Sequence, residues 1–446
     1  MRHADRSPGG QKKSYNPAVT AVDAGPDAPA NSNHTPETSG KEPRPAPVVM
    51  KFGGSSVADL DRLRSVARRV AARACEQPVV VVVSAMGKTT NSLVGMAKQL
   101  IAPPPMRELD MLLTTGERSS MALLAIAIQA AGQPAISLTG SQCGIITDHQ
   151  HGRARIMEVR PFRIVDELAA GSVVIVGGFQ GVSYKREVTT LGRGGSDTTA
   201  VALAAALGAD CEIYSDVDGV YSADPREVEH TRRIPELDYE CMQALARAGA
   251  KVLHAQAVEL AEERKIAIYA RHASPGISGQ TVIRRNKVTK LGIRAIASDP
   301  AVTLLGIEFC GLPPGGLAKL ASAMCALGLR YIRVDSRGAS GLLSQSQHSD
   351  CDAIINRFAA IVRGLGAALD SAHVREAWAQ VSCIGAGVEE CPEISARAYR
   401  ALETSAIKIE GVHTETRSLA FIVSRSSRRA ALAALHRAFI SDPPTA

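Results

Sequence analysis

The chain has 446 residues, of which 45% are hydrophobic, and carries a formal net charge of +7 with a pI of about 9.0. This length exceeds what one hydrophobic core usually organises, so two or three domains are expected. Aromatic residues make up only 4% of the chain and do not alternate with a basic stripe, so the positive charge favours small anionic substrates over nucleic acid.

The spacing of the cysteines and the length of the apolar runs indicate the cellular compartment of the protein. Nine cysteines are scattered and never spaced as C-x-x-C, which indicates reduced thiols and disfavours a zinc site or a disulfide framework. No continuous apolar run reaches the roughly 18 residues that a membrane helix needs, and the first residues lack the apolar core of a signal peptide. We therefore expect a cytoplasmic protein without a membrane partner.

Residues 1–47 are rich in proline and polar residues and contain hardly any large apolar side chains. Such a segment cannot bury enough apolar surface to offset its conformational entropy, so a disordered tail is expected. The alternative is a transit peptide, which acidic residues such as Asp5 and Glu37 disfavour.

Residues 48–285 alternate between short runs rich in Val and Ile and helical patterns. This alternation predicts one domain with a mostly parallel sheet sandwiched by helices, in which ligands bind at the carboxyl ends of the strands. The expected strands are 48–52, 78–86, 134–140, 172–179, 211–217 and 265–271, and the expected helices include 57–70, 121–132 and 239–264.

A glycine-rich turn follows the first expected strand, in the run KFGGSS. Backbone N–H groups of Gly53 and Gly54, ahead of an amphipathic helix, would form a seat for an anion. Lys51 would add a full positive charge to this seat.

A second glycine-rich run, GRGGSDTTA, covers residues 192–200. Its glycines allow the backbone to approach a charged ligand closely, and Arg193 offers a planar fork for a carboxylate or phosphate. Ser196 and Asp197 stand where a helix N-cap is expected. The two runs together predict a kinase for a small carboxylic acid.

Two further acidic positions each have two interpretations. Glu117 either favours the N-terminus of a helix or pairs with a substrate ammonium group. Asp216 and Asp218 either form a plain polar turn or belong to a nucleotide loop, with Tyr221 packing near a base and Arg226 reaching phosphate. The spacing alone does not decide between these interpretations.

Other motifs favour ordinary roles. Residues 85–90 imitate a P-loop, but Val82 stands where its first glycine is needed. His149 and His151 have a metal-like spacing without further ligands, so a solvated loop is favoured over a metal site. His254 is expected to be a packing or helix-face histidine.

After residue 290 two stretches repeat the order strand, loop, helix, two strands and helix. Their first strands are expected at 302–309 and 380–388. The repeat predicts two ferredoxin-like βαββαβ modules, one at 286–378 with a linker and one at 379–446. Neither contains a catalytic constellation.

The motif order in residues 48–285 resembles that of the aspartate kinases, which have the amino-acid kinase fold. The motifs are KFGGSS, VVVVVSAMG, ELDMLLTTGER, GIITDHQHGRARI, VGGFQGV, TTLGRGGSDTTAVALAAALGAD, EIYSDVDGVYSADPR and GAKVLH. The related carbamate, acetylglutamate and uridylate kinases do not share the whole series. The C-terminal repeats are similar to the ACT modules that bind amino-acid effectors in this family.

The resemblance implies transfer of the ATP γ-phosphoryl group to the β-carboxylate of L-aspartate, giving 4-phospho-L-aspartate, with Mg²⁺ bridging the ATP phosphates. Lys51 would neutralise the transferring group with the amides of Gly53 and Gly54, and Asp197 would orient Lys51. Arg193 would bind the α-carboxylate of aspartate and Glu117 its ammonium group. The other implied positions are Ser55, Thr90 and Ser196 for the substrate, and Ser215, Asp216, Asp218, Tyr221, Arg226 and Lys251 for the nucleotide.

The ACT-like repeats depart from the family pattern. Glu393 stands where the family usually has glycine, and a side chain there costs about 1 kcal/mol or more where φ must be positive. The departures predict weak or altered feedback by lysine or threonine. The resemblance also implies a homodimer or a higher homo-oligomer.

Two alternatives remain. One is an inactive sensor that keeps the fold, which the joint retention of Lys51, Glu117, Arg193 and Asp197 disfavours. The other is an amino-acid kinase with a different acceptor, which Arg193 and Glu117 in this motif order disfavour.

Overall fold

The computed structural model describes residues 45–192, 194–285, 291–345, 351–366 and 368–441. Most of the expected tail, residues 1–44, lies outside the described residues. The expected domain boundaries stay predictions, and the elements are given below with their bounds.

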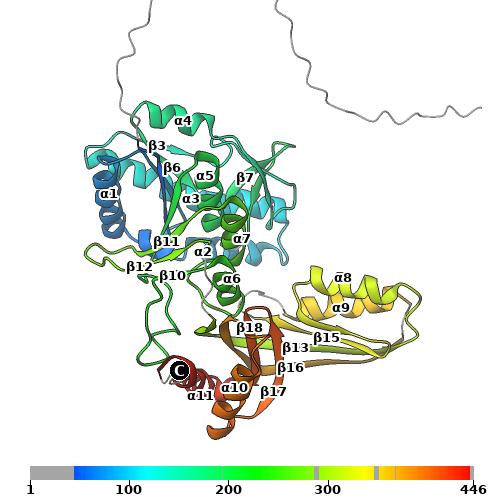
Figure 1. Ribbon diagram of the computed structural model, residues 1–446. Coiled ribbons are helices and arrows are strands. Elements are labelled where there is room, and N and C mark those ends of the chain that lie inside the picture. Colours follow the sequence, from blue (N-terminus) through cyan, green and yellow to red (C-terminus); the bar gives the residue numbers. More distant parts are fainter. Residues whose placement is uncertain (1–44, 193, 286–290, 346–350, 367, 442–446) are drawn as a thin grey trace, which may run out of the picture. The chain divides into compact units, whose positions relative to one another are not determined.

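The part before residue 285 is built on one eight-stranded sheet in the order β10-β12-β11-β9-β1-β2-β6-β3 (Figure 1). Every neighbouring pair is parallel except β11 and β12, so the predicted mostly parallel sheet is confirmed. The strands are β1 (Val48–Phe52), β2 (Val79–Val83), β3 (Ala135–Leu138), β6 (Val173–Gly177), β9 (Asp210–Ser215), β10 (Glu236–Leu237), β11 (Ile268–His272) and β12 (Gln280–Ile283).

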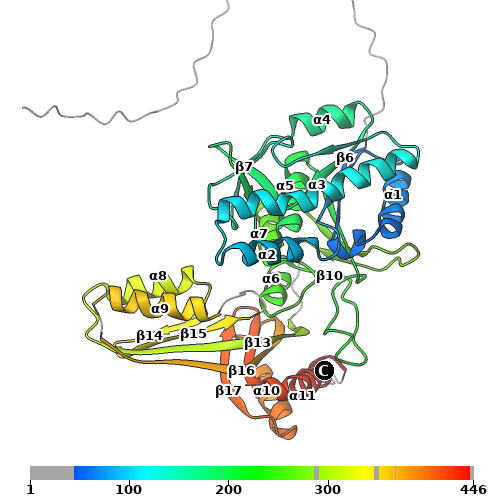
Figure 2. The ribbon, with the colours of Figure 1, turned by 180° about the vertical axis from the view of Figure 1, so that it is seen from behind.

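Alternating side chains of the central strands fill two cores. Val80 and Val82 pack on the face covered by α5 and α7, whereas Val79, Val81 and Val83 pack against α1 and α3. Figures 1 and 2 show these helix layers from opposite sides. The helices are α1 (Leu60–Ala74), α2 (Thr89–Leu100), α3 (Met106–Ala130), α4 (Phe162–Ala169), α5 (Gly195–Leu207), α6 (Tyr239–Arg247) and α7 (Ala255–Arg264), with a short 3-10 turn η1 (Gly54–Val57).

Two helices differ from their expected bounds. Helix α3 begins well before residue 121, and among the described residues it is the one helix long and apolar enough to cross a membrane. It packs instead against α1, β3 and β6 and buries several polar side chains, among them Asp110 and Glu117. The helix expected at 239–264 is broken, because Gly249 has φ +105° and its Cβ position lies 2.5 Å from the Ser298 carbonyl oxygen.

A second sheet, not predicted from the sequence, has the order β5-β4-β7-β8. Its strands are β4 (Ile145–Thr147), β5 (Ile156–Val159), β7 (Gln180–Ser183) and β8 (Val188–Thr190). The loop between β4 and β5 contains the histidine pair, and β8 leads into the second glycine-rich run.

The C-terminal part forms a six-stranded sheet in the order β14-β15-β13-β16-β18-β17. The expected first strands of the two repeats were too short, since β13 (Gly292–Cys310) and β16 (Ala368–Ala386) each extend over 19 residues. The remaining elements are β14 (Arg330–Val334), β15 (Gly338–Ser344), β17 (Ile409–Glu415), β18 (Ser418–Ser424), α8 (Gly316–Ala326), α9 (Cys351–Gly364), α10 (Pro392–Thr404) and α11 (Arg428–His436), followed by a short π-helical turn η3 (Arg437–Ser441).

The long strands β13 and β16 pair with each other in antiparallel fashion along their length. Ile296 pairs with Cys383 in the half next to β18, and Leu305 pairs with Val374 in the half next to β15. The first half of β13 therefore completes the sheet of the second predicted module, and the first half of β16 completes the sheet of the first module. The expected boundary between residues 378 and 379 falls inside β16.

Candidate active site

The candidate site lies at the carboxyl ends of β9, β1, β2 and β6, which are neighbours in the parallel sheet. Lys51 on β1 reaches Asp197 in the first turn of α5, with Nζ 2.5 Å from Oδ1. Their side chains are only 12% and 11% exposed, so water screens this ion pair weakly. The two glycine-rich runs therefore meet at a buried pair of opposite charges, the contact that the resemblance to the aspartate kinases implied.

The two glycines of the turn after β1 lie close to the Lys51 ammonium group and to the loop after β2. A Cβ atom at Gly53 would lie 3.6 Å from Lys51 Nζ, and one at Gly54 would lie 2.7 Å from the Ala85 carbonyl oxygen. The Gly87 N–H also donates to the Gly54 carbonyl oxygen over 3.0 Å. Gly54 thus permits close packing of the loops after β1 and β2, and Gly53 brings the backbone within van der Waals contact of the Lys51 ammonium group.

The start of α5 differs from the predicted cap. Its N-cap is Gly194, with φ +70°, so Ser196 and Asp197 lie inside the first turn. The expectation of an N-cap at Ser196 or Asp197 was wrong because glycine adopts the left-handed conformation required there. Ser84 Oγ donates to Ser196 Oγ over 3.0 Å, which joins the end of β2 to this turn. Arg193 lies outside the described residues.

His254 lies directly before α7 and packs on the same glycine-rich run. A Cβ atom at Gly194 would lie 2.2 Å from the ring carbon Cγ of His254. The expected packing role is confirmed, at the N-cap position of α7 rather than on its face. A residue larger than glycine at position 194 would displace this ring.

Glu117 lies in the middle of α3 and is only 3% exposed. Its Oε1 accepts a hydrogen bond from the Ala85 N–H over 3.2 Å, while Oε2 has no hydrogen-bond partner among the described residues. Burial raises the pKa of Glu117 to about 7. The helix N-terminus interpretation is wrong, and what remains is a buried carboxylate with one oxygen free to bind a cation.

Ser55 and Thr90 lie on the segments that follow the two loops. Ser55 is exposed in η1, and Thr90 is half-buried in the first turn of α2. The structure thus places Lys51 on β1, Gly53 and Gly54 in the turn after it, Ser196 and Asp197 in the first turn of α5 and Glu117 inside α3, and it brings Lys51 and Asp197 into contact.

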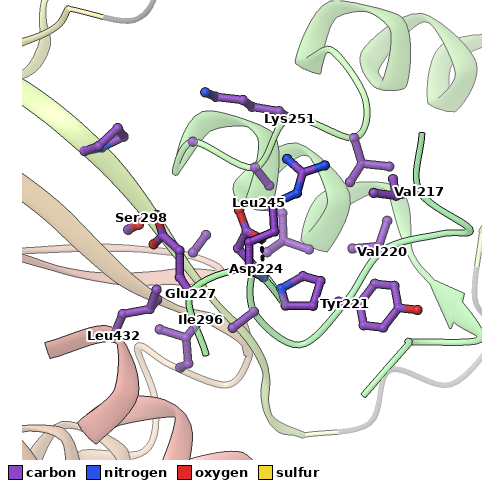
Figure 3. Close-up of a pocket in the computed structure, with 18 of the residues that line it drawn as sticks. Val217, Val220, Tyr221, Asp224, Glu227, Leu245, Lys251, Ile296, Ser298 and Leu432 are labelled. Atoms are coloured by element: carbon purple, nitrogen blue, oxygen red, sulfur yellow. Dashed lines mark hydrogen bonds between the residues drawn. The ribbon is translucent and has the colours of Figure 1, made fainter. Parts of the chain in front are cut away.

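A separate cavity of about 230 Å³ adjoins the loop after β9 (Figure 3). Five of the predicted nucleotide positions line it: Ser215, Asp216, Tyr221, Arg226 and Lys251. Ile296, Ser298 and Arg428 from the C-terminal part line it as well. The cavity therefore has walls from both parts of the chain.

Asp218 is not among the residues that line this cavity. Its Oδ2 lies 2.5 Å from Arg233 Nη1, and its Oδ1 accepts a hydrogen bond from the Tyr221 hydroxyl over 2.8 Å. Asp218 holds Tyr221 in place beside the cavity. Asp216 forms an exposed ion pair with Arg226 at 3.0 Å.

The contact between His151 and Asp110 was not predicted from the sequence. His151 is no solvated loop residue, because its Nδ1 lies 2.8 Å from Oδ2 of the fully buried Asp110. Within the described ranges no group of three His, Cys, Asp or Glu residues is placed to hold a metal ion. Asp110 precedes Glu117 by two helical turns in the run ELDMLLTTGER. This spacing places both acids on one face of a helix, and it was the sequence signal that could have predicted a buried role for Asp110.

The chain matches the amino acid kinase family over residues 46–271 and the ACT domain over residues 381–439. It is 40% identical over 409 residues to an aspartokinase of Mycobacterium tuberculosis, with 88% of this chain and 96% of the relative covered. It is 41% identical over 400 residues to an aspartokinase of Geobacillus stearothermophilus, covering 88% and 97%.

Solved structures share the fold. Escherichia coli aspartokinase III with aspartate and ADP is 24% identical, with a TM-score of 0.77 and coverage of 89% of this chain and 100% of that chain. The same enzyme with lysine and aspartate is 25% identical, with a TM-score of 0.68 and coverage of 88% and 99%. The predicted fold class is confirmed, and the chain belongs to the aspartokinases, kinases of the amino acid kinase family with C-terminal ACT domains.

Proposed function

We propose that the chain transfers the γ-phosphoryl group of ATP to the β-carboxylate of L-aspartate and forms 4-phospho-L-aspartate. The observation that carries this proposal is the buried pair of Lys51 and Asp197 beside a glycine turn, close in the fold to the half-satisfied carboxylate of Glu117. A related enzyme of the same fold binds aspartate and ADP, which agrees with both substrates.

Phosphoryl transfer depends mainly on positioning and on neutralising charge. Lys51 would contact the transferring group, since Asp197 holds its ammonium at the end of β1. The amides of Gly53 and Gly54 would bind the same oxygens. Mg²⁺, bound chiefly by the ATP phosphates, would neutralise part of their charge.

The acceptor needs no strong general base, because a carboxylate is already a nucleophile at pH 7. Glu117 Oε2 would bind the ammonium group of aspartate, and the bound cation would keep Glu117 ionised. Arg193 would bind the α-carboxylate, and Ser55, Thr90 and Ser196 would supply further hydrogen bonds. This arrangement would turn the β-carboxylate toward Lys51.

The nucleotide would occupy the cavity after β9. Tyr221 would pack near the base, while Arg226 and Lys251 would bind phosphate oxygens, with Ser215 and Asp216 lining the same cavity. Asp218 would contribute indirectly, because it accepts a hydrogen bond from the Tyr221 hydroxyl and so holds the Tyr221 ring in place.

Feedback by lysine or threonine would be weak or altered. The related enzyme of E. coli has been solved with lysine. Glu393 is not among the described residues with positive φ, because it belongs to the first turn of α10. The backbone cost expected at Glu393 therefore does not arise. Its exposed carboxylate, which accepts a hydrogen bond from Cys391 Sγ over 3.1 Å, would instead place negative charge at the effector loop.

We further propose that the protein forms homo-oligomers through its ACT modules in the cytoplasm. Its product would enter the biosynthesis of lysine, threonine and methionine.

The test is ATP-dependent formation of aspartyl β-hydroxamate from L-aspartate and hydroxylamine. Wild type should be active, Lys51→Ala inactive, and Lys98→Ala, an exposed lysine of α2, as active as wild type. Wild type that is silent with aspartate but active with glutamate or another carboxylic acid would support the different-acceptor alternative. A folded wild type silent with every acceptor would support the sensor alternative.

A further inference from the structure

Asp110 is a fully buried carboxylate on α3 to which the proposed reaction gives no role. Its Oδ1 accepts hydrogen bonds from Thr190 Oγ1 over 2.6 Å and from the Gly152 N–H over 3.0 Å. Its Oδ2 accepts from the same N–H over 3.1 Å and from His151 Nδ1 over 2.8 Å. All four contacts lead to two segments, the loop after β4 and the end of β8.

The end of β8 leads directly into the second glycine-rich run, and the loop after β4 packs beside it. The Ala154 N–H donates to the Thr190 carbonyl oxygen over 2.9 Å. A Cβ atom at Gly192 would lie 3.2 Å from the Gly152 carbonyl oxygen, and Gly192 has φ +79°. The backbone just before position 193 is therefore packed on the loop that Asp110 holds.

Asp110 and Glu117 share one helix and, seven residues apart, one face of it. Glu117 contacts the loop after β2 through the Ala85 N–H. Helix α3 thus carries one buried acid that binds the loop after β2 and a second that binds the approach to the glycine-rich run. Two turns of helix set the distance between the two attachments.

We propose that Asp110 is a positioning residue of the aspartate subsite. It fixes the backbone at Gly192, where the glycine-rich run begins, relative to Glu117, so that the two sides of the aspartate site stay at a constant separation. This inference rests on the proposed function, since it assumes that Glu117 and the glycines on either side of position 193, Gly192 and Gly194, border the aspartate site. Asp110 itself touches neither substrate.

The test compares Asp110→Asn and Thr190→Val with Thr189→Val as a matched control. Thr189 and Thr190 are both buried, but Thr189 Oγ1 bonds to Thr147 Oγ1 over 2.5 Å and not to Asp110. We expect the KM for aspartate to rise about 10-fold or more in both test variants, because small misplacements of binding groups are costly. The KM for ATP should change less than about 2-fold, and Thr189→Val should resemble wild type in both constants.

A role confined to folding would not separate the two substrates. Thermal stabilisation by ADP should therefore persist in Asp110→Asn, while stabilisation by aspartate should need about 10-fold more ligand than in the wild type. Should Asp110→Asn fail to fold, Thr190→Val carries the same test, since it removes a single hydroxyl group. If the wild type is active, two results would overturn this inference without affecting the proposed function. In the first, Thr190→Val has the aspartate KM of the wild type; in the second, it raises the KM values for aspartate and ATP equally. A wild type without hydroxamate formation would overturn the proposed function instead.

Discussion

Arg428 of α11 donates a pair of hydrogen bonds to the carboxylate of Glu227, over 2.5 and 2.8 Å. Glu227 belongs to the loop that lines the candidate nucleotide cavity, and Arg428 lines the same cavity. Their side chains are 20% and 12% exposed, so this is a partly desolvated, bidentate pair. A helix of the C-terminal part thus holds a wall of the cavity.

Removing one partner of this pair should weaken nucleotide binding. Arg428→Met and Glu227→Gln should each raise the Kd for ATP, and the double variant should be less impaired than the sum of both. We expect a coupling free energy of about 0.5–3 kcal/mol in this double-mutant cycle, measured by calorimetric titration of ATP. The exposed Arg437 of η3 supplies the control, and Arg437→Ala should bind ATP as wild type does. Strictly additive effects would show that the pair does not support the cavity.

The glycines after β1 should differ sharply in tolerance to alanine. Gly54→Ala would place Cβ 2.7 Å from a backbone oxygen that cannot move aside easily, so kcat/KM should fall about 100-fold or more. Gly95 lies in α2 with no atom within 4 Å of its Cβ position, and Gly95→Ala should leave activity intact and stabilise the fold by about 0.5–1 kcal/mol. Steady-state kinetics and chemical denaturation measure both, and equal activity of the two variants would refute the close-packing explanation.

The pH dependence of aspartate binding should report Glu117. Burial raises its pKa to about 7, and only the ionised carboxylate pairs with an ammonium group. The KM for aspartate should therefore fall as the pH rises from 6 to about 8, whereas the KM for ATP should not show this transition. Glu117→Gln should raise the KM for aspartate and remove the transition. A wild-type profile that Glu117→Gln leaves unchanged would assign the titration to another group.

The same pKa shift predicts a change in stability. A carboxyl group whose folded pKa is about 7, against an ordinary value of 4.5, favours the folded state below pH 4.5, and this contribution is lost as the pH rises toward 7. Relative to Glu117→Gln, the wild type should lose roughly 1–3 kcal/mol of unfolding free energy between pH 5 and pH 8. Urea denaturation at the two pH values measures this difference. Parallel stability curves for the two proteins would contradict the buried, cation-free state of Glu117.

Titration with lysine and threonine should show weak inhibition of the wild type. Glu393→Gly removes the carboxylate at the start of α10 and should strengthen inhibition by at least one of the two amino acids. Glu389→Gly, a change at an exposed acid shortly before α10, serves as the control for charge. Tight inhibition of the wild type by either amino acid would disprove the proposed effect of Glu393.

Much of the sheet could be predicted because its central strands are continuous apolar runs between helices. The rule that ligand-binding loops gather at the carboxyl ends of parallel strands predicted the place of the turn after β1, whereas the contact of Lys51 with Asp197 was implied by the family resemblance. That rule places loops and not individual contacts, so it could not show that Glu117 binds the Ala85 N–H from inside a helix.

Other features depend on contacts between residues far apart in the sequence. The break before α7 requires Gly249 to meet the backbone of Ser298, which no local pattern reveals. The early start of helix α3 was missed because its first turns carry polar residues and lie outside the apolar run. One of these residues is Asp110, whose partners lie on β8 and on the loop after β4. The length of β13 was missed because its two halves pack in different modules.

The crossed pairing of β13 and β16 has a consequence for how this chain can be divided. A protein that ends before β16 would lose the strand that pairs with β13 along its whole length. A protein that lacks the first half of β13 would expose an unpaired edge of β16 in the second module. Neither module can be excised, exchanged with that of a relative or cut away by a protease without damaging the other. Any exchange between homologues must transfer the whole stretch from β13 to α11.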